Sequence, residues 1–136
     1  MNTRRRLSKA ERQAIYDKMG GHCAYCGCEL TLENMQVDHK IPVKLYETDA
    51  ITNEELNSFE NLLPACRSCN HYKDALTVEK FRQLIERGPE ILARDSVAYR
   101  AAVRFGMVKP KPKKVVFFFE RAERGEDIPK RERVDF

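Results

Sequence analysis

Two Cys-x-x-Cys pairs constrain the fold of this chain more than any other feature of its sequence. The pairs lie in the segments GGHCAYCGC and PACRSCNHYK, and their members are Cys23, Cys26, Cys66 and Cys69. Each pair makes a short turn that can direct two sulfur atoms at one ion, and two such turns supply the four thiolates of a closed tetrahedral zinc site. The spacing therefore predicts that a structural Zn²⁺ joins two distant turns and fixes both ends of the segment between them.

The rest of the composition allows one modest hydrophobic core. The chain has 136 residues, of which 42% are hydrophobic and 34% charged, and it contains no Trp. One small domain with arms is expected rather than two independent cores. We predict a basic arm and helix over residues 1–20, a zinc-containing core over 21–87, and a third part over 88–136. This last part should contain a helical extension, a Lys/Pro linker, a strand and a charged tail.

The five cysteines could form disulfides if the protein were secreted. However, the N-terminal sequence MNTRRRLSKAERQ lacks the apolar segment of a signal peptide, and no stretch approaches the length of a transmembrane helix. We therefore expect a cytoplasmic protein that keeps its thiols reduced and uses them to bind metal.

Positive charge is concentrated in two segments. The N-terminal cluster consists of Arg4, Arg5 and Arg6, and the second, interrupted by prolines, consists of Lys109, Lys111, Lys113 and Lys114. Removing these seven charges turns the net charge of +4 into −3. Such segments attract phosphate groups, but they also solubilise chain ends, and charge alone does not decide between these interpretations.

Local patterns predict the α+β fold class. Ser8 and Glu11 form a capping box that should open a helix running to Gly20-Gly21. The expected inner face of this helix consists of Ala10, Ala14, Ile15 and Met19. The other predicted elements are short strands ending at His39 and covering Leu62-Leu63, a helical turn at 53–57 within an irregular excursion over 44–60, helices over 70–76, 77–86 and 89–105, and a C-terminal strand over the sequence VVFFFE at 115–120.

The order of the motifs resembles the HNH endonuclease family, in its zinc-stapled ββα-metal branch. The resembling elements are the first Cys-x-x-Cys pair, VDHKIP, ENLLPAC and CRSCNHYK, between about residues 21 and 73. Several motifs in the correct order are far more specific than one zinc knuckle. The resemblance implies an HNH core of two short antiparallel strands packed on a helix around a divalent metal. His39 should end the first strand, and Asn70 should begin the helix.

The proposed chemistry assigns roles to four polar residues of these motifs. Hydrolysis of a phosphodiester needs an activated water, charge neutralisation at phosphorus and help for the departing oxygen. A neutral imidazole can take a proton from water, so we predict that His39 is the general base. The resemblance implies that Asp38 and Asn70 bind the catalytic Mg²⁺ or Mn²⁺, and that Asn61 orients the loop bearing His39. Two oxygen ligands leave positions for water and phosphate, as Mg²⁺ prefers.

Several neighbouring residues have alternative interpretations. His71 is rotated by about 100° from Asn70 on a helix, so both cannot easily reach one metal, and Asn70 is favoured. His22 could replace a thiolate, but a surface histidine is the simpler expectation. Cys28 is expected to be a free buried thiol, and the run Phe117–Phe119 to be core or a partner contact. Arg67 and Lys73 are expected either to contact phosphate or to be exposed helix charges.

The sequence thus predicts a divalent-metal-dependent DNA endonuclease, an enzyme that hydrolyses phosphodiester bonds. The alternative is a non-catalytic, zinc-stapled nucleic-acid-binding module, which would have no need for the set Asp38, His39, Asn61 and Asn70; a thiol redox protein is a weaker third hypothesis. Small HNH proteins occur in phage packaging modules, mobile elements and restriction systems, and the resemblance does not choose among them. One active centre cuts one strand at a time, so double-strand cleavage would need repeated nicking, a homodimer or a larger packaging or restriction assembly.

Overall fold

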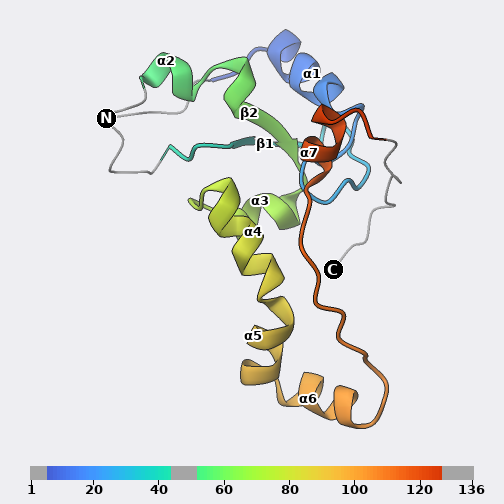
Figure 1. The fold of residues 1–136 in the computed structure, drawn as a ribbon. Coiled ribbons are helices and arrows are strands. Elements are labelled where there is room, and N and C mark those ends of the chain that lie inside the picture. Colours follow the sequence, from blue (N-terminus) through green and yellow to red (C-terminus); the bar gives the residue numbers. More distant parts are fainter. Residues whose placement is uncertain (1–5, 44–51, 127–136) are drawn as a thin grey trace.

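The computed structural model describes residues 6–43 and 52–126 and has the predicted α+β architecture (Figure 1). A two-stranded sheet lies near one end of a set of short helices. In chain order the elements are α1 (Lys9–Lys18), β1 (Gln36–His39), α2 (Asn53–Leu56), the 3₁₀ turn η1 (Phe59–Asn61), β2 (Leu62–Ala65), α3 (Arg67–Lys73), α4 (Val78–Glu86), α5 (Gly88–Asp95), α6 (Val97–Arg104) and α7 (Phe118–Glu123).

The sheet contains the two short antiparallel strands expected from the sequence. Asp38 of β1 lies opposite Leu63 of β2, and His39 lies opposite Leu62. β2 is buried along its whole length, with α1 packed against it and α3 packed against β1. In Figure 1, α1 and α3 lie on opposite sides of the sheet. This sandwich fixes the position of the strand that carries Asp38 and His39.

Helix α1 begins as predicted, but its inner face is rotated from the expected one. Ser8 caps the helix, and the reciprocal hydrogen bonds between Ser8 and Glu11 form the capping box. Ala10 and Ala14 are exposed. The contact row is instead formed by Arg12, Ile15, Tyr16 and Met19. This row has the i, i+3, i+4, i+7 spacing of a helix face. It faces the core in place of the two alanines because its side chains are long enough to reach β2 and the loop before β1.

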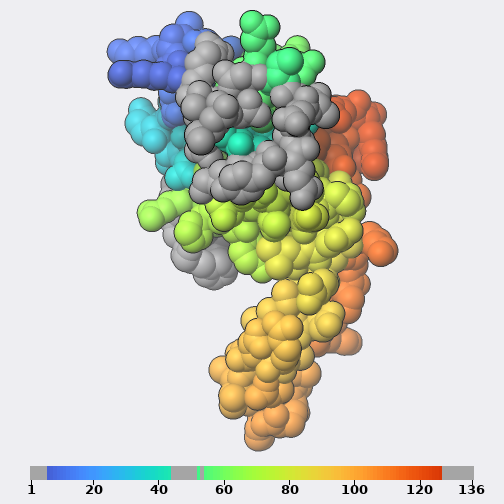
Figure 2. Space-filling view, turned by 90° about the vertical axis from the view of Figure 1, so that its left-hand side faces the viewer, coloured from blue at the N-terminus to red at the C-terminus, as the bar shows by residue number. Residues whose placement is uncertain are grey.

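The predicted helix after Gly88 is two helices, α5 and α6, which project from the rest of the molecule (Figure 2). Ser96 separates them because it serves both ends at once. Its backbone N–H donates to the carbonyl of Leu92 and closes α5. Its side chain accepts a hydrogen bond from the N–H of Tyr99 at 3.1 Å and caps α6. The α5–α6 pair and the segment 105–114, which begins with a turn, are called the limb below.

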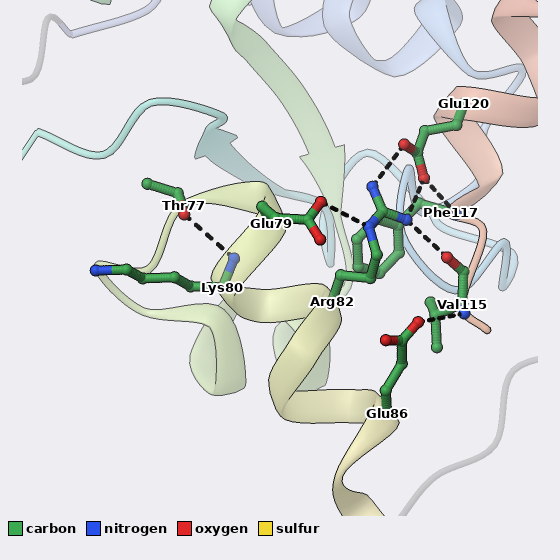
Figure 3. Close-up of polar contacts among 8 residues, drawn as sticks. All are labelled: Thr77, Glu79, Lys80, Arg82, Glu86, Val115, Phe117 and Glu120. Carbon is green, nitrogen blue, oxygen red and sulfur yellow. Dashed lines mark hydrogen bonds and ion pairs between the residues drawn. The ribbon is translucent and has the colours of Figure 1, made fainter. Parts of the chain in front are cut away.

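The predicted C-terminal strand is wrong. Residues 115–117 are extended without a strand partner among the described residues, and α7 starts at Phe118. Side chains occupy the backbone groups that a neighbouring strand would use: Glu86 accepts from the N–H of Val115 at 2.9 Å, and Glu120 accepts from the N–H of Phe117 at 2.9 Å (Figure 3). β-Branched and aromatic residues fit any half-buried extended segment, so their presence did not require a sheet.

Aromatic side chains from this segment complete the core beside the first cysteine pair. Phe117 and Phe119 pack in the same cluster as Tyr25 and Phe81. Phe118 lies against Gly27, whose φ of +78° favours glycine; a Cβ there would lie only 2.6 Å from the Phe118 ring. The segment that follows the limb therefore covers the turn that carries the first cysteine pair.

None of the helices in residues 6–43 and 52–126 is both long and apolar enough to cross a lipid bilayer.

The division of the chain into three parts, with boundaries after residues 20 and 87, stays a prediction. Arg4 and Arg5, and residues 44–51 of the predicted excursion, lie outside the described residues. The helical turn predicted within that excursion is present as α2.

Candidate active site and metal centre

The four predicted zinc ligands form one cluster. Their sulfur atoms all lie within 4.8 Å of one another, and the Sγ atoms of Cys26 and Cys66 are 3.9 Å apart. Cys66 is also the N-cap of α3, because its sulfur accepts a hydrogen bond from the N–H of Cys69 at 3.4 Å. The second pair is therefore the first turn of α3, and the helix begins at Arg67 rather than at Asn70 as expected.

The chemistry of the cluster suits a structural zinc ion. Hydrogen bonding between Cys23 and Cys26 raises the pKa of the Cys23 thiol to about 11 and lowers the pKa of Cys26. Hydrogen bonding with Cys23 likewise raises the pKa of Cys66 and Cys69. Four thiolates at this distance thus need a cation to ionise together, and a tetrahedral Zn²⁺ would supply that charge. The donor set and its spacing fit the predicted zinc.

Two neighbours of the cluster are not part of it. His22, expected at the surface, is buried: its Nδ1 lies 2.9 Å from the carbonyl oxygen of Gly20, and its ring stacks on Phe118 at a centroid distance of 5.7 Å. His22 is buried because Phe118, almost a hundred residues later in the chain, packs on its ring. The sequence around His22 gave no sign of this contact. Cys28 is a buried free thiol within the hydrophobic core, as expected.

Asp38 is a buried carboxylate with two donors on one oxygen. It is 5% exposed, and its Oδ2 lies 3.0 Å from the Nζ of Lys73. The hydroxyl of Tyr25 donates to the same oxygen through a short hydrogen bond. Burial, together with the charge of Asp38, raises the pKa of Tyr25 above its usual range, so the phenol stays protonated and donates. Neither contact uses Oδ1.

The burial of Lys73 is the largest difference between the predicted and the observed site. Lys73 was expected to be exposed or to contact phosphate, yet it is fully buried. Its Nζ also donates to the carbonyl oxygen of His39 at 3.0 Å, so one ammonium group holds both members of the Asp-His pair. The reason is its position: Lys73 lies one helical turn beyond Asn70, on the face of α3 that packs against β1. A buried carboxylate needs such a counter-charge.

His39 ends β1, as predicted, and its side chain has a partner that the sequence did not indicate. The residue is 7% exposed, and its Nε2 lies 3.0 Å from the Oδ1 of Asn57. Side chains of adjacent strand residues point to opposite faces. Asp38 thus contacts α3, whereas His39 contacts the segment that follows α2. Asn57 stands in the sequence ELNSFEN, where only proximity in space distinguishes it from Asn61.

Asn61 makes the backbone hydrogen bonds expected for it. Its Oδ1 accepts from the N–H of Ile41 at 2.9 Å, and its Nδ2 donates to the carbonyls of Ile41 at 3.2 Å and Leu56 at 2.7 Å. The Nζ of Lys18 donates to the carbonyls of Phe59 and Leu62 on either side of it. The loop just after His39 is therefore tied to η1, while a role of Asn61 in catalysis stays a prediction.

Asn70 lies in the second turn of α3 and faces the start of β1. Its Nδ2 donates to the Oε1 of Gln36 at 2.7 Å. Beside it is a pocket of about 400 Å³ lined by polar residues, namely Gln36, Arg67, Asn70, His71 and Asp74. Gln36 and Asp38 occupy the same face of β1, two residues apart. The β1–α3 interface therefore carries two adjacent contacts, Asn70 with Gln36 and Lys73 with Asp38, and brings both predicted metal ligands to one interface.

Comparison with known proteins identifies the class to which this arrangement belongs. Residues 23–75 match the family model of the HNH endonuclease. This match agrees with the order of the motifs, which predicted similarity to the HNH endonuclease family over the same part of the chain.

Among solved structures, the chain is similar to the Type II-C Cas9 enzyme from Actinomyces naeslundii, with 23% sequence identity and a TM-score of 0.45. The similarity covers 60% of this chain and 9% of that one. The comparison with curated protein sequences gave no match.

Proposed function

We propose that the protein is a divalent-metal-dependent endonuclease that hydrolyses phosphodiester bonds in DNA. The observation that carries the proposal is the interface between β1 and α3 within an HNH domain. It holds a buried carboxylate, Asp38, in a fixed position, and His39 follows directly on the strand. A module that only bound nucleic acid would have no use for a buried carboxylate and a positioned imidazole, which cost stability to maintain.

His39 is the general base in this proposal, and its partner indicates which nitrogen acts. The oxygen of Asn57 can only accept a hydrogen bond, so the Nε2 of His39 carries the proton in that contact. In a neutral ring the lone pair then lies on Nδ1. We assign proton abstraction from water to Nδ1, which is buried in this structure and must become accessible to water for this step. Asn61 keeps the loop after His39 in place through its bonds to Ile41.

Asp38 and Asn70 would hold the divalent metal. Asp38 leaves Oδ1 outside its contacts with Tyr25 and Lys73, and Asn70 uses its Nδ2 on Gln36, so each retains an oxygen. Hard oxygen donors suit Mg²⁺ and Mn²⁺, and such a metal supplies Lewis-acid stabilisation of the phosphate and the departing oxygen. The ammonium of Lys73 beside Asp38 opposes a second cation, so we expect weak metal binding.

The test is cleavage of supercoiled plasmid by zinc-loaded protein with added Mg²⁺ or Mn²⁺. Because one centre cuts one strand, nicked circles should form before linear DNA, and linear DNA should form by repeated nicking or through a homodimer or larger assembly. If the wild-type protein binds DNA but cuts neither plasmid nor single-stranded DNA with either metal, it is a binding module and the proposal fails.

Two neighbouring residues of α3 provide a matched pair for the metal site. Asn70→Ala should raise the metal concentration for half-maximal cleavage by more than about tenfold, as expected for loss of metal support. His71→Ala should behave like the wild type, because His71 is exposed and is not a proposed metal ligand, although it lines the pocket beside Asn70. The reverse result would place the ligand one residue later. Asp38→Asn should resemble Asn70→Ala, and it is preferable to Asp38→Ala because it keeps an acceptor for the buried Lys73.

The Lys/Pro segment of the limb should contribute affinity without sequence choice. Lys109, Lys111, Lys113 and Lys114 are exposed, and none has an ion-pair partner within the described ranges. Replacing all four with Gln should reduce the slope of log affinity against log salt by about 0.9 for each lost phosphate contact. The control is Arg94→Gln, since Arg94 is already paired with Asp95 at 2.8 Å. An unchanged slope in the fourfold variant would exclude the segment from the interface; Arg6, which is exposed, would be tested next.

A further inference from the structure

Tyr25 connects the cysteine cluster with the proposed active site. It lies between the two cysteines of the first pair and is only 3% exposed. Its hydroxyl donates to the Oδ2 of Asp38, the oxygen that Lys73 also contacts. Asp38 is therefore held from two sides, by a residue of the first knuckle and by a residue of α3. Tyr25 lies inside the first Cys-x-x-Cys pair and Lys73 ends the CRSCNHYK motif, but the sequence predicted no contact with Asp38 for either residue.

The ring of Tyr25 is enclosed by three phenyl rings. Phe81, Phe117 and Phe119 meet it edge-on, at centroid distances of 5.3, 5.1 and 6.0 Å and interplanar angles of 85–86°. This geometry is favourable for aromatic pairs, and it leaves the ring little freedom to tilt. Phe81 belongs to α4, and the other two belong to the C-terminal segment. All three lie outside residues 23–75, the range that matches the HNH family.

The backbone of the first knuckle is tied to the same C-terminal segment. The N–H of Phe118 donates to the carbonyl of Tyr25 at 3.1 Å, and the N–H of Phe119 donates to the carbonyl of Ala24 at 2.7 Å. The ring and the backbone of Tyr25 thus both depend on residues that follow the limb.

Arg82 of α4 fastens the C-terminal segment in turn (Figure 3). Its guanidinium donates to both carboxylate oxygens of Glu120, at 2.7 and 2.6 Å, and to the carbonyl of Val115 at 2.7 Å. It also lies 4.9 Å from the centre of the Phe117 ring. A bidentate pair of this kind gives geometric specificity as well as stability. The contacts form a continuous path from Arg82 through Phe117 and Tyr25 to Asp38.

We propose that Tyr25 is a positioning residue for Asp38, and that the segment Val115–Glu123 is a required part of the active site although it lies outside the matched domain. The inference rests on the proposed function. Two donors fix the carboxylate of Asp38 and leave Oδ1 outside these contacts. Without the hydroxyl, Lys73 is the remaining side-chain donor in these contacts, and the carboxylate can turn to pair with the ammonium through both oxygens. Metal binding then competes with a complete ion pair.

The test is Tyr25→Phe, which keeps the ring in its enclosure and removes only the hydroxyl. The variant should retain its zinc and its DNA affinity. Its affinity for Mn²⁺, measured by electron paramagnetic resonance without DNA, should fall by about 10- to 100-fold, as for other residues that support metal ligands. The Mn²⁺ concentration for half-maximal cleavage should rise in parallel, and saturating Mn²⁺ should restore much of the rate. The matched control is Tyr16→Phe, which removes a hydroxyl that donates to the carbonyl of Leu30 at 3.0 Å.

A second variant tests the C-terminal segment. Arg82→Met should weaken Mn²⁺ binding in the same direction as Tyr25→Phe, and the double variant should be no worse than Tyr25→Phe alone, because both act through one hydroxyl. The control is Arg87→Met, an exposed arginine at the end of the same helix. Wild-type Mn²⁺ affinity in Tyr25→Phe would overturn the inference alone. A wild-type protein that binds Mn²⁺ but cuts no DNA would overturn the proposed function instead.

Discussion

His39→Ala should slow plasmid cleavage at least a hundredfold, about the size expected for loss of a general base. The variant should remain folded and zinc-loaded, because the side chain of His39 lies outside the sulfur cluster. It should also keep its metal affinity, since Lys73 contacts only the backbone of His39 and would continue to hold Asp38. Single-turnover cleavage at saturating metal, measured beside Mn²⁺ binding, separates these expectations.

The matched control for that experiment is His71→Ala. Both changes remove an imidazole from the candidate site, but His71 is exposed on α3 and lines only the pocket beside Asn70. Its loss should leave the rate within a few-fold of the wild type. If His39→Ala cuts as fast as the wild type, another group activates the water and our assignment of the base is wrong.

Cys66→Ser should cost the protein its zinc, its fold and its activity together. Cys66 is a member of the sulfur cluster and also the cap of α3. The helix that begins there carries both Asn70 and Lys73, so its release would remove a proposed metal ligand and the counter-charge of Asp38. Elemental analysis should find one zinc per wild-type chain and much less in the variant. Circular dichroism should show loss of the helical signal in the variant under conditions in which the wild type is folded.

Cys28→Ala is the control for the loss of a thiol. Cys28 is buried in the core but lies outside the cluster, so the variant should keep one zinc per chain and melt only slightly earlier. A wild-type protein without zinc, or with a disulfide between Cys23 and Cys26, would contradict the assignment of the cluster.

Features encoded by neighbouring residues were predictable from the sequence. The capping box at Ser8 and the two Cys-x-x-Cys turns of the sulfur cluster depend on short spacings, and each is present. The two strands follow from apolar residues next to the Asp-His pair and from Leu62-Leu63. The partners in the capping box lie within a few residues of each other, and a common zinc ion would join the two distant cysteine pairs.

The environment of Asp38 was not predictable in this way, because its partners come from distant parts of the chain. Lys73 was indistinguishable from a solvated helix charge until α3 was placed against β1. Tyr25 looked like a spacer between two cysteines. The strand predicted at 115–120 failed for a related reason: side chains of Glu86 and Glu120 occupy its backbone groups, and intrinsic preference cannot anticipate such partners.

The limb leaves the body of the protein and returns to it at almost the same point. Val115 donates its backbone N–H to Glu86, 29 positions earlier in the chain, at 2.9 Å. Everything between these residues is therefore a closed excursion whose two ends are already joined. The entropy of closing such an excursion grows only slowly with its length. Under the proposed function, insertions, deletions or exchanges in the limb would change how far the protein reaches along DNA, while the contacts around Asp38 and His39 would stay the same.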